Sequence, residues 1–511
     1  MPFYDNLFFR TKNKLRIKFD IRKRNNLLIL QKHYFSNDSK YFKIGIIGSG
    51  PSALYCCKHF LKNQNIKVDI FDKLPNPYGL IRYGVAPDHI SVKNIYKTFN
   101  PVLSNKEKYR FFGNVNIGID IEIEDLRNYY NAVIFCCGAS DSSLPKEEYK
   151  KENGIFHAKD LIYFYNNFYD DLRCKNIDTY LNTHENFSNS IIIGNGNVSL
   201  DIARILIKSY DDLIKTDINF NYLNIIRRHN IKHIYIIGRR GFWQSSFTNS
   251  ELRELFSLKD TKVILDKKNY DLCFEIKNYD ETNKMKQRQN KLFLDMVDNY
   301  EQLKKNPTLY DKYKIIQFIF YHEITNIHNI NNHMKEIQLG LNKDIYSSEN
   351  YHKNNKNCYD INNEKINIKT PLLIFATGFK KDNFSLNFYN ESIDKYKDDI
   401  MNKKFAIFKA GWFQTGAKGN IASQIINTKQ NITEILNFLN TTTIYYDNDI
   451  TELLKRKKIH FVSMDQWNYI QSLEKNNGEQ KGRCAQKFAT VKDILQILSD
   501  KRNEQNLKKE D

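Results

Sequence analysis

The first of two glycine-rich turns has the residue types and spacing of a dinucleotide-binding turn. Gly48, Gly50 and Ala53 form a G-x-G-x-x-A motif between a short apolar run, 43–47, and a helical stretch. In such a turn the first glycine permits the tight bend, the second lets the backbone approach a pyrophosphate, and the third small residue lets the helix pack closely on the strand. Asp72 ends the next apolar run and would accept a hydrogen bond from a ribose hydroxyl. An acid at this position favours FAD or NAD over NADP. The alternative to dinucleotide binding is that the turn is simply tight and binds no ligand.

The second glycine-rich turn is followed by basic residues instead of an acid. It comprises Gly194, Asn195, Gly196, Asn197 and Val198, after an apolar run and before a helical stretch. The next apolar run, 233–237, ends in Gly238-Arg239-Arg240-Gly241. Arginine at this place can form bidentate hydrogen bonds with a 2′-phosphate, so the pattern predicts NADP(H). The alternative is an ordinary solvated pair of surface arginines.

Two such turns in one chain imply two cofactors, and FAD with NADPH is the simplest pair. The eight cysteines include no C-x-x-C pair and no group with zinc or iron–sulfur spacing. A flavoprotein without an internal dithiol must pass its electrons to an external acceptor. Residues that position the two turns are therefore expected to form an α/β fold with two dinucleotide-binding, Rossmann-like domains.

Several segments resemble one family of flavoproteins. The block from Pro77 to His89, PYGLIRYGVAPDH, closely resembles the signature of mitochondrial NADPH:ferredoxin (adrenodoxin-type) reductases. Further similar segments are 194–206, 238–254, 411–422 and 462–467. Two positions depart from the family pattern: Gln414 stands where a basic residue is usual and Ala417 where proline is usual. Part of the surface that meets the redox partner is therefore expected to differ.

The resemblance implies a set of site residues in this chain. Besides the glycine turns, the implied FAD contacts are Ser52, Asp72, Leu80 and Ile117, with Trp412, Gly419, Asn420 and Ile421 around the isoalloxazine. The implied NADP contacts are Asn195, Gly196, Asn197, Val198, Arg239, Arg240, Glu251 and Gly419. His89 and Trp412 are the candidate catalytic residues; His89 either tunes the flavin, relays protons or makes a structural hydrogen bond.

The family pattern also implies an NADP-binding domain inserted in a discontinuous FAD-binding domain. We expect a presequence in 1–40, the first part of the FAD-binding domain in 41–145, the NADP-binding domain in 146–369 and the second part of the FAD-binding domain in 370–511. Within the NADP-binding domain, 256–320 and 343–366 are expected to be low-complexity insertions, the first of them with a helix over 292–300.

Charge is concentrated near the start of the chain. The 511 residues carry a net charge of +19, and residues 1–40 hold ten Lys or Arg against three Asp, which leaves +12 for the rest. Interleaved apolar residues make 1–40 resemble a mitochondrial presequence, although Asp5, Asp20 and the scarcity of serine are unusual in one; a basic disordered tail is the alternative. No run reaches the 18 apolar residues expected of a membrane span.

These observations predict an oxidoreductase of the mitochondrial matrix. It would transfer electrons from NADPH through FAD, one at a time, to an acidic, adrenodoxin-like [2Fe-2S] ferredoxin that supplies iron–sulfur cluster or haem-related biosynthesis. We expect a monomer, no nucleic acid partner and at most a peripheral membrane association. A glutamate-synthase-like flavoprotein subunit and an inactive flavoprotein-fold binding module are the alternatives.

Overall fold

The computed structural model describes residues 40–139, 141–142, 144–169, 172–275, 283–342, 365–419 and 421–510. Contacts divide the chain into two units, Met1–Tyr41 and Phe42–Asp511, and all that follows concerns the second. The predicted presequence, apart from Lys40, and nearly all of the predicted insertion 343–366 lie outside the described residues.

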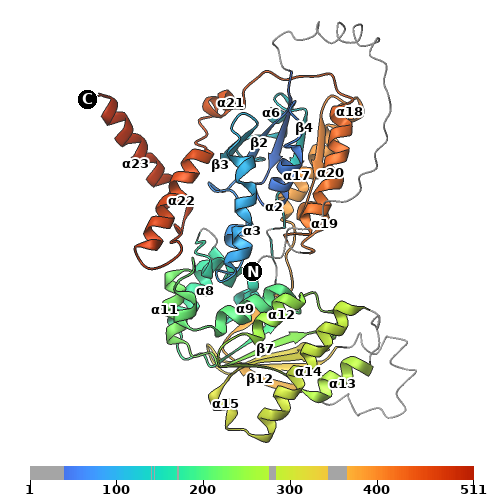
Figure 1. The fold of residues 1–511 in the computed structure, drawn as a ribbon, viewed down its shortest axis with the longest axis vertical. Coiled ribbons are helices and arrows are strands. Elements are labelled where there is room, and N and C mark those ends of the chain that lie inside the picture. Colours follow the sequence, from blue (N-terminus) through green and yellow to red (C-terminus); the bar gives the residue numbers. More distant parts are fainter. Residues whose placement is uncertain are drawn as a thin grey trace, which may run out of the picture. The chain divides into compact units, whose positions relative to one another are not determined.

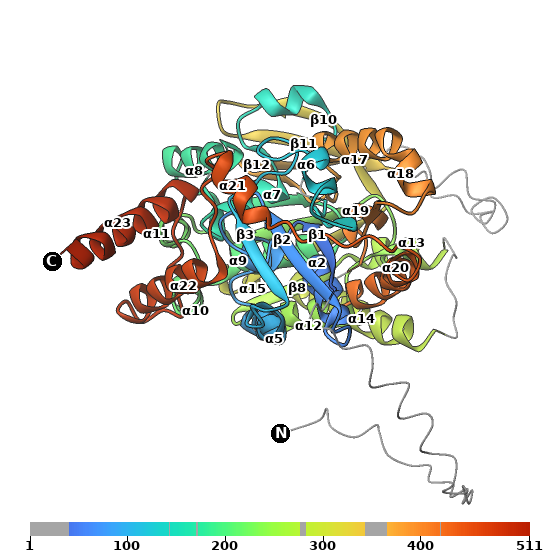
Figure 2. The same ribbon diagram turned by 90° about the horizontal axis from the view of Figure 1, so that it is seen from above.

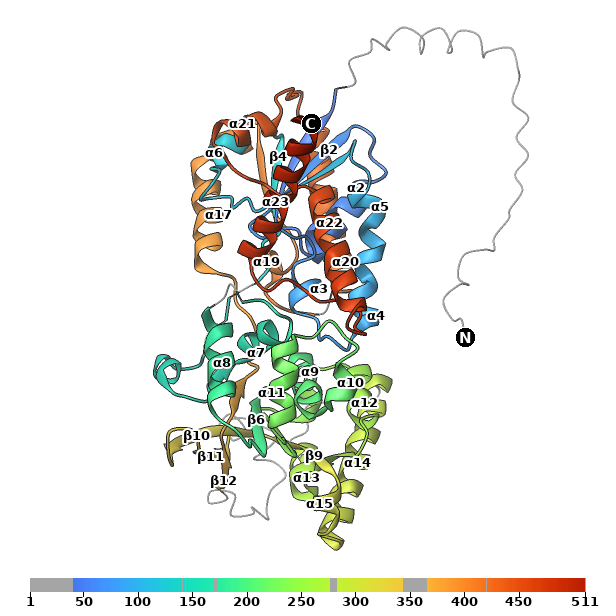
Figure 3. The same ribbon diagram turned by 90° about the vertical axis from the view of Figure 1, so that its left-hand side faces the viewer.

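A five-stranded parallel sheet carries the first glycine turn (Figure 1). Its strand order is β14-β4-β1-β2-β3. The strands are β1 (Phe42–Ile47), β2 (Ile66–Asp72), β3 (Tyr109–Gly113), β4 (Ala132–Phe135) and β14 (Ala406–Lys409). Their side chains are mostly buried, as expected for a parallel sheet covered on both faces. Figure 3 shows α2 (Pro51–Phe60) and α20 (Gln424–Leu439) on one side of this sheet and α17 (Asn383–Lys395) on the other.

A six-stranded parallel sheet carries the second glycine turn. Its order is β5-β13-β6-β7-β9-β8. The strands are β5 (Ile155–His157), β6 (Asn189–Ile193), β7 (His233–Gly238), β8 (Thr261–Leu265), β9 (Lys314–Phe320) and β13 (Leu373–Phe375). A three-stranded antiparallel sheet follows β9, with β10 (His322–Asn329), β11 (Lys335–Leu341) and β12 (Ile366–Thr370).

The order of the strands along the chain confirms the predicted fold class. Strands β5 to β13 all lie between β4 and β14 in sequence, so the six-stranded sheet interrupts the chain that builds the five-stranded sheet. Both sheets are parallel and each places a glycine turn directly after a strand, at β1 and at β6. The architecture is therefore α/β with two Rossmann-like sheets, the second inserted in the first.

The prediction of an insertion over 256–320 is wrong. This segment supplies β8 and β9, and β9 lies between β7 and β8 in the interior of the six-stranded sheet. The apolar run of β9, KIIQFIF, has the composition of a buried parallel strand. The predicted helix over 292–300 is confirmed, as part of the longer helix α14 (Lys284–Lys305) that packs against β8.

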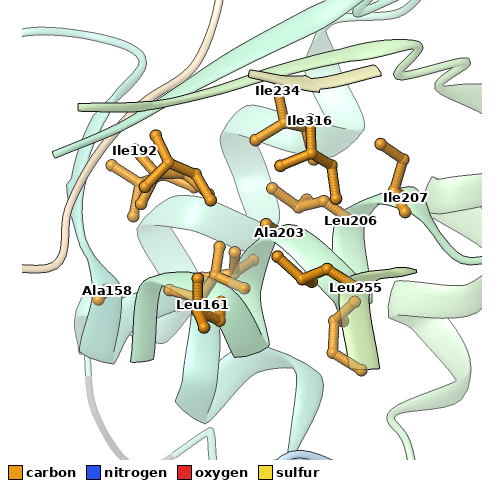
Figure 4. Close-up of a cluster of buried hydrophobic side chains, with 14 of the residues drawn as sticks. Ala158, Leu161, Ile192, Ala203, Leu206, Ile207, Ile234, Leu255 and Ile316 are labelled. Atoms are coloured by element: carbon orange, nitrogen blue, oxygen red, sulfur yellow. The ribbon is translucent and has the colours of Figure 1, made fainter. Parts of the chain in front are cut away.

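Helices on one face of the six-stranded sheet bury a large apolar core (Figure 4). They include α7 (Ala158–Tyr165), α9 (Asn197–Ile207) and α12 (Asn249–Phe256). Ile192, Ile234 and Ile316 lie on neighbouring strands, close to Ala203 and Leu206 of α9. This packing fixes the helix that follows the second glycine turn against its sheet, so the turn itself is held at the sheet edge.

Two C-terminal helices pack on each other, α22 (Met464–Glu479) and α23 (Val491–Glu510), as Figures 1 and 2 show. Trp467 and Ile470 of α22 are buried with Ile494 and Leu498 of α23. Across the described ranges, the helices are either too short or too polar to cross a membrane. Further described helices are α3 (Leu80–Tyr83), α4 (Ile90–Lys93), α5 (Asn100–Leu103), α6 (Ile123–Arg127), α8 (Leu172–Thr183), α10 (Tyr210–Leu213), α11 (Phe220–Arg228), α13 (Lys267–Glu275), α15 (Leu309–Lys312), α18 (Lys397–Met401), α19 (Trp412–Thr415) and α21 (Ile450–Arg456).

Candidate cofactor-binding site

The first glycine turn leaves the start of α2 open for a ligand. Gly48 has φ +99°, and a Cβ there would stand 2.6 Å from the carbonyl oxygen of Cys136, so only glycine fits. Gly50 caps α2 without a side-chain hydrogen bond, and a Cβ at Gly50 would meet nothing within 4 Å. The first backbone N–H groups of α2 are therefore uncovered on the side where a pyrophosphate would approach.

Asp72 is held at the end of β2 by the residues around it. One oxygen of its carboxylate accepts hydrogen bonds from the backbone N–H (2.8 Å) and hydroxyl (2.5 Å) of Ser49, and the other accepts one from the N–H of Leu74 (2.9 Å). Burial raises the pKa of Asp72 and outweighs the opposite effect of these hydrogen bonds. The carboxylate is thus oriented at the strand end, where a ribose hydroxyl could add a further hydrogen bond.

A cavity joins this turn to distant segments of the chain. Among the predicted cofactor contacts, its lining includes Gly48, Gly50, Ser52, Asp72, Leu80, Trp412 and Ile421. Gly411 has φ +66°, and a Cβ there would overlap the hydroxyl of Ser52, so the backbone before Trp412 lies against the first glycine turn. The indole Nε1–H of Trp412 donates a hydrogen bond to the carbonyl of Lys418 (3.0 Å), which fixes the ring at the cavity wall.

Not every predicted contact lines this cavity. Ala53 is fully buried between α2 and the sheet, as its role in close packing requires. Ile117 is 5% exposed and belongs to the core on the other face of the five-stranded sheet. Gly419 is exposed and lies outside the lining, and Asn420 lies outside the described residues. The glycine cradle, the helix start and the oriented acid nevertheless fit one dinucleotide with an unphosphorylated ribose, as in FAD.

The second glycine turn has the same arrangement, and hydrogen bonds of its asparagine side chains hold it in place. Gly194 has φ +140°, and a Cβ there would stand 2.3 Å from the carbonyl oxygen of Ala376. The amide Nδ2 of Asn195 donates a hydrogen bond to the carbonyl of Arg240 (3.2 Å), and Oδ1 of Asn197 accepts one from the N–H of Thr248 (2.9 Å). Gly196 caps α9, and Val198 packs against its apolar core. The asparagines thus tie the turn to the segment that carries the arginines.

Arg239 and Arg240 follow the end of β7 and are both exposed. In the part of the chain that the structure describes, neither guanidinium makes an ion pair or a side-chain hydrogen bond. An exposed pair of guanidinium groups beside a glycine turn can bind a phosphate monoester. The residues of the second turn therefore fit a nucleotide that carries a 2′-phosphate.

His89 lies in a cluster of charged groups instead of the cavity. Its Nε2 is 2.5 Å from Oε2 of Glu254 and 3.7 Å from Oε2 of Glu251, and its Nδ1 is 3.6 Å from Oδ1 of Asp201. Burial and the nearby charge of Asp201 raise the pKa of Glu251 to about 7. His89 is absent from the cavity lining, so the structure does not bring it together with Trp412 there.

A buried arginine holds this cluster together. Arg204 is 2% exposed; it donates hydrogen bonds to both oxygens of Asp88 (2.7 and 3.0 Å) and to Asp201 (2.7 Å), and its Nη1 is 3.3 Å from Oε2 of Glu254. The sequence patterns point to His89 and Glu251 but not to Asp201, Arg204 or Glu254. Their spacing is a usable signal, because 201/204 and 251/254 are i, i+3 pairs, a spacing that places two side chains on one face of a helix, here α9 and α12.

Comparison with known proteins gives consistent results. A family model described as an NAD(P)-binding Rossmann-like domain matches residues 46–114. The chain is 26% identical over 487 residues to the mitochondrial NADPH:adrenodoxin oxidoreductase of Arabidopsis thaliana, which covers 91% of this chain and 97% of that protein.

A second relative is more similar over a shorter stretch. The chain is 38% identical over 243 residues to the probable mitochondrial NADPH:adrenodoxin oxidoreductase of Schizosaccharomyces pombe, so this match spans about half of both chains (47% and 50%). Among solved structures, Mycobacterium tuberculosis FprA in complex with NADPH superposes with a TM-score of 0.70 at 24% identity, covering 90% of this chain and 100% of that one. The structural likeness concerns the fold.

Proposed function

We propose that this chain, which is similar over nearly its whole length to a mitochondrial NADPH:adrenodoxin oxidoreductase, is a flavoprotein that transfers electrons from NADPH through FAD to a ferredoxin. The proposal rests mainly on the difference between the two glycine turns. The strand that follows the first turn ends in an acidic residue, whereas the strand that follows the second ends in basic residues. Asp72 follows the first turn, and Arg239 with Arg240 follows the second. One chain can thereby hold one cofactor with an unmodified ribose and another with a 2′-phosphate.

The first turn would hold FAD. The open start of α2 would accept the pyrophosphate, with Gly48, Gly50 and Ser52 against it, and Asp72 would accept a hydrogen bond from the adenosine ribose. Leu80, Trp412 and Ile421 would line the cavity along the ring system, with Gly419 and Asn420 near its edge. Bound FAD supplies the chemistry, because it can accept two electrons from NADPH and release them singly.

The second turn would hold NADPH. Asn195, Gly196, Asn197 and Val198 would place the pyrophosphate at the start of α9, and Arg239 and Arg240 would bind the 2′-phosphate. Glu251, on α12, lies close to His89 and would face the nicotinamide half. The hydrogen-bonded pair of His89 and Glu254 can hold a proton at Nε2 and pass it on, since a carboxylate orients the ring.

The partner would be an acidic, adrenodoxin-like [2Fe-2S] ferredoxin that supplies iron–sulfur cluster or haem-related biosynthesis in the mitochondrial matrix. The net charge of +12 outside residues 1–40 supports this choice, since opposite charge steers association. We also propose that residues 41–145 and 370–511 form the FAD-binding domain and 146–369 the NADP-binding domain, in a monomer. The organisation of the two sheets supports this division.

Cofactor loading tests the proposal. The purified full chain should be yellow, or become so when FAD is added, with about one FAD bound per chain. Anaerobic NADPH should then bleach the flavin absorbance, and NADH should do so far more slowly. A chain that takes up no FAD after reconstitution would end the proposal, and equal rates with both nucleotides would end its NADPH part.

A further inference from the structure

Helix α20 (Figure 3) begins with two large aliphatic side chains that are open to solvent. Ile425 is 43% exposed and Ile426 is 71% exposed. Across the described ranges, the other strongly exposed large apolar residues do not follow one another directly in the sequence. Adjacent exposed apolar side chains that are rimmed by polar residues can mark an interaction site, whereas a single one needs no explanation.

The same helical turn forms part of the cavity wall. Trp412, Ile421 and Gln424 line the cavity at the first glycine turn, and Gln424 is buried. Ile425 and Ile426 follow Gln424 directly in α20, where successive residues are about 100° apart around the helix axis. The two isoleucines are therefore on the outer side of a turn whose inner side lines the cavity.

Lysines without acidic neighbours in the sequence accompany the two isoleucines. Residues 405–433 contain Lys409, Lys418 and Lys429 and no aspartate or glutamate. All three lysines are exposed, and none of them forms an ion pair with another described residue. Lys429 follows Ile425 by four positions and Ile426 by three, so all three lie on one face of α20.

A chain of hydrogen bonds connects α20 to a further lysine. Asn431 of α20 donates a hydrogen bond to Oε1 of Gln414 in α19 (2.7 Å), and the carbonyl of Gln414 accepts one from Nζ of Lys381 (3.3 Å). Burial and the like charge of Lys409 lower the pKa of Lys381. The acid next to it, Asp382, caps α17 with its carboxylate. The surface beside the cavity is therefore basic at α19 as well as at α20.

We propose that Ile425 and Ile426, with the lysines around them, form the docking surface for an acidic electron-accepting protein. The inference rests on the proposed function, because that function supplies the acidic [2Fe-2S] acceptor. The isoleucines would make the apolar contact, and Lys418 and Lys429 would pair with carboxylates at its rim. An acceptor has to approach the cavity closely, and docking here places it against the turn that carries Gln424. This position favours a protein acceptor over a lipid surface.

The apolar contact is tested with Ile425→Gln combined with Ile426→Gln in the FAD-loaded full chain. The matched control is Leu294→Gln combined with Leu172→Gln, because Leu294 on α14 is 44% exposed and Leu172 on α8 is 73% exposed. Reduction of an acidic [2Fe-2S] ferredoxin by NADPH is measured at a series of ferredoxin concentrations. The isoleucine variant should have a KM for ferredoxin about ten-fold above that of the control, since two apolar side chains leave the interface, with kcat nearly unchanged.

The charged rim is tested with Lys418→Gln combined with Lys429→Gln. The matched control is Lys304→Gln combined with Lys305→Gln, two exposed lysines at the end of α14. At about 0.05 M salt the rim variant should have a KM for ferredoxin about five-fold above that of its control, and at about 0.3 M salt the difference should fade, because salt screens exposed charges. A rim variant that equals its control at low salt would overturn the role of the lysines.

The inference as a whole is overturned if the isoleucine variant and its control have the same KM for ferredoxin. It is also overturned if the isoleucine variant reduces a small neutral acceptor more slowly than the wild type, since the damage would then lie in the cavity. Loss of binding to phosphatidylserine vesicles, or dissociation of a dimer in sedimentation, with an unchanged KM would assign the isoleucines to a membrane or to a second copy of the chain instead. Failure of the proposed function is recognised separately, because the wild-type chain itself would then reduce no ferredoxin.

Discussion

The two glycine turns have the same backbone arrangement, but the charged side chains at the following strand ends are held in place at the first turn and not at the second. At the first turn the strand-end acid is held by three hydrogen bonds, and the turn opens into a cavity lined by several segments that are distant in sequence. At the second turn the strand-end arginines are exposed, and within the described ranges they have no ion-pair partner. A site whose side chains are already in place before binding suits a cofactor that remains bound to the protein. Exposed side chains without ion-pair partners suit a cofactor that binds and leaves in each catalytic cycle.

The charged cluster around His89 marks where the two halves meet. Asp88 and His89 come from the segment after the first turn, whereas Arg204, Glu251 and Glu254 belong to α9 and α12 of the second. Because its members come from both halves, this partly buried network forms only when both halves are in place. It ties the residues that would handle protons to the helix that follows the second turn.

The largest expected effect lies at the second turn. Arg239→Ala combined with Arg240→Ala should weaken NADPH binding about a hundred-fold, because two charged hydrogen-bonding groups are lost, and should leave NADH almost unaffected. The dissociation constants of both nucleotides are measured by titration of the FAD-loaded protein. The exposed pair Arg227 and Arg228, at the end of α11, provides a matched double-alanine control. An equal loss of affinity for NADPH and NADH would show that the arginines do not recognise the 2′-phosphate, and the proposed difference between the two turns would fall.

The first turn should respond through FAD instead. Ser49→Ala removes the hydroxyl that donates to Asp72, so the acid loses one of its three constraints, and FAD should bind about ten-fold more weakly. Fluorescence titration of the apoprotein measures this. Asn197→Ala at the second turn is the counterpart, and it should change the affinity for NADPH but not for FAD. A Ser49→Ala protein with wild-type FAD affinity would show that the orientation of Asp72 is unimportant.

The cluster between the turns gives a pH-dependent signal. Glu251 has a pKa of about 7 in the folded chain against about 4.5 for an ordinary glutamate, so the folded state keeps a proton that the unfolded state releases between these values. The free energy of unfolding therefore falls as the pH rises from about 4.5 to 7. Glu251→Gln abolishes this penalty and should be more stable than the wild type by about 1 kcal/mol at pH 8, but not at pH 4.5. Denaturant unfolding at the two pH values, without nucleotide, checks the sign; a constant difference would refute it.

The smallest expected effect concerns the partner. If the basic charge of the chain steers an acidic ferredoxin, raising the salt concentration from about 0.05 to 0.3 M should slow ferredoxin reduction by about three-fold or more. Direct reduction of a small neutral acceptor by the same enzyme serves as the control and should change little. A flat response for the ferredoxin would leave the charge without a role in docking.

Much of this molecule could be predicted from its sequence, because its chemistry is encoded in short local patterns. The strand, turn and helix around Gly48 and around Gly194 are contiguous in sequence, and the structure shows both as expected. The strands of 256–320 are not predictable in this way, because the long polar helix α14 separates them and leaves the apolar run of β9 isolated in a polar stretch of sequence.

Contacts between distant segments could not be predicted in the same way. The pairing of His89 with Glu254 joins residues 165 positions apart, and Lys159 reaches the cavity only because β5 and α7 are placed beside it. No local pattern of residue types predicts such a contact between distant segments. The chemistry of each turn can therefore be predicted from the sequence, whereas the residues that connect the two turns can be identified only from the structure.

Ferredoxin reduction tests the central claim most directly. The FAD-loaded full chain is mixed anaerobically with an acidic [2Fe-2S] ferredoxin and either NADPH or NADH, and the absorbance of the iron–sulfur cluster is followed. The account predicts that NADPH reduces the ferredoxin catalytically, that NADH does so far more slowly, and that omission of FAD abolishes the reaction. A chain that oxidises NADPH at the same rate with and without ferredoxin, while the cluster stays oxidised, would contradict it.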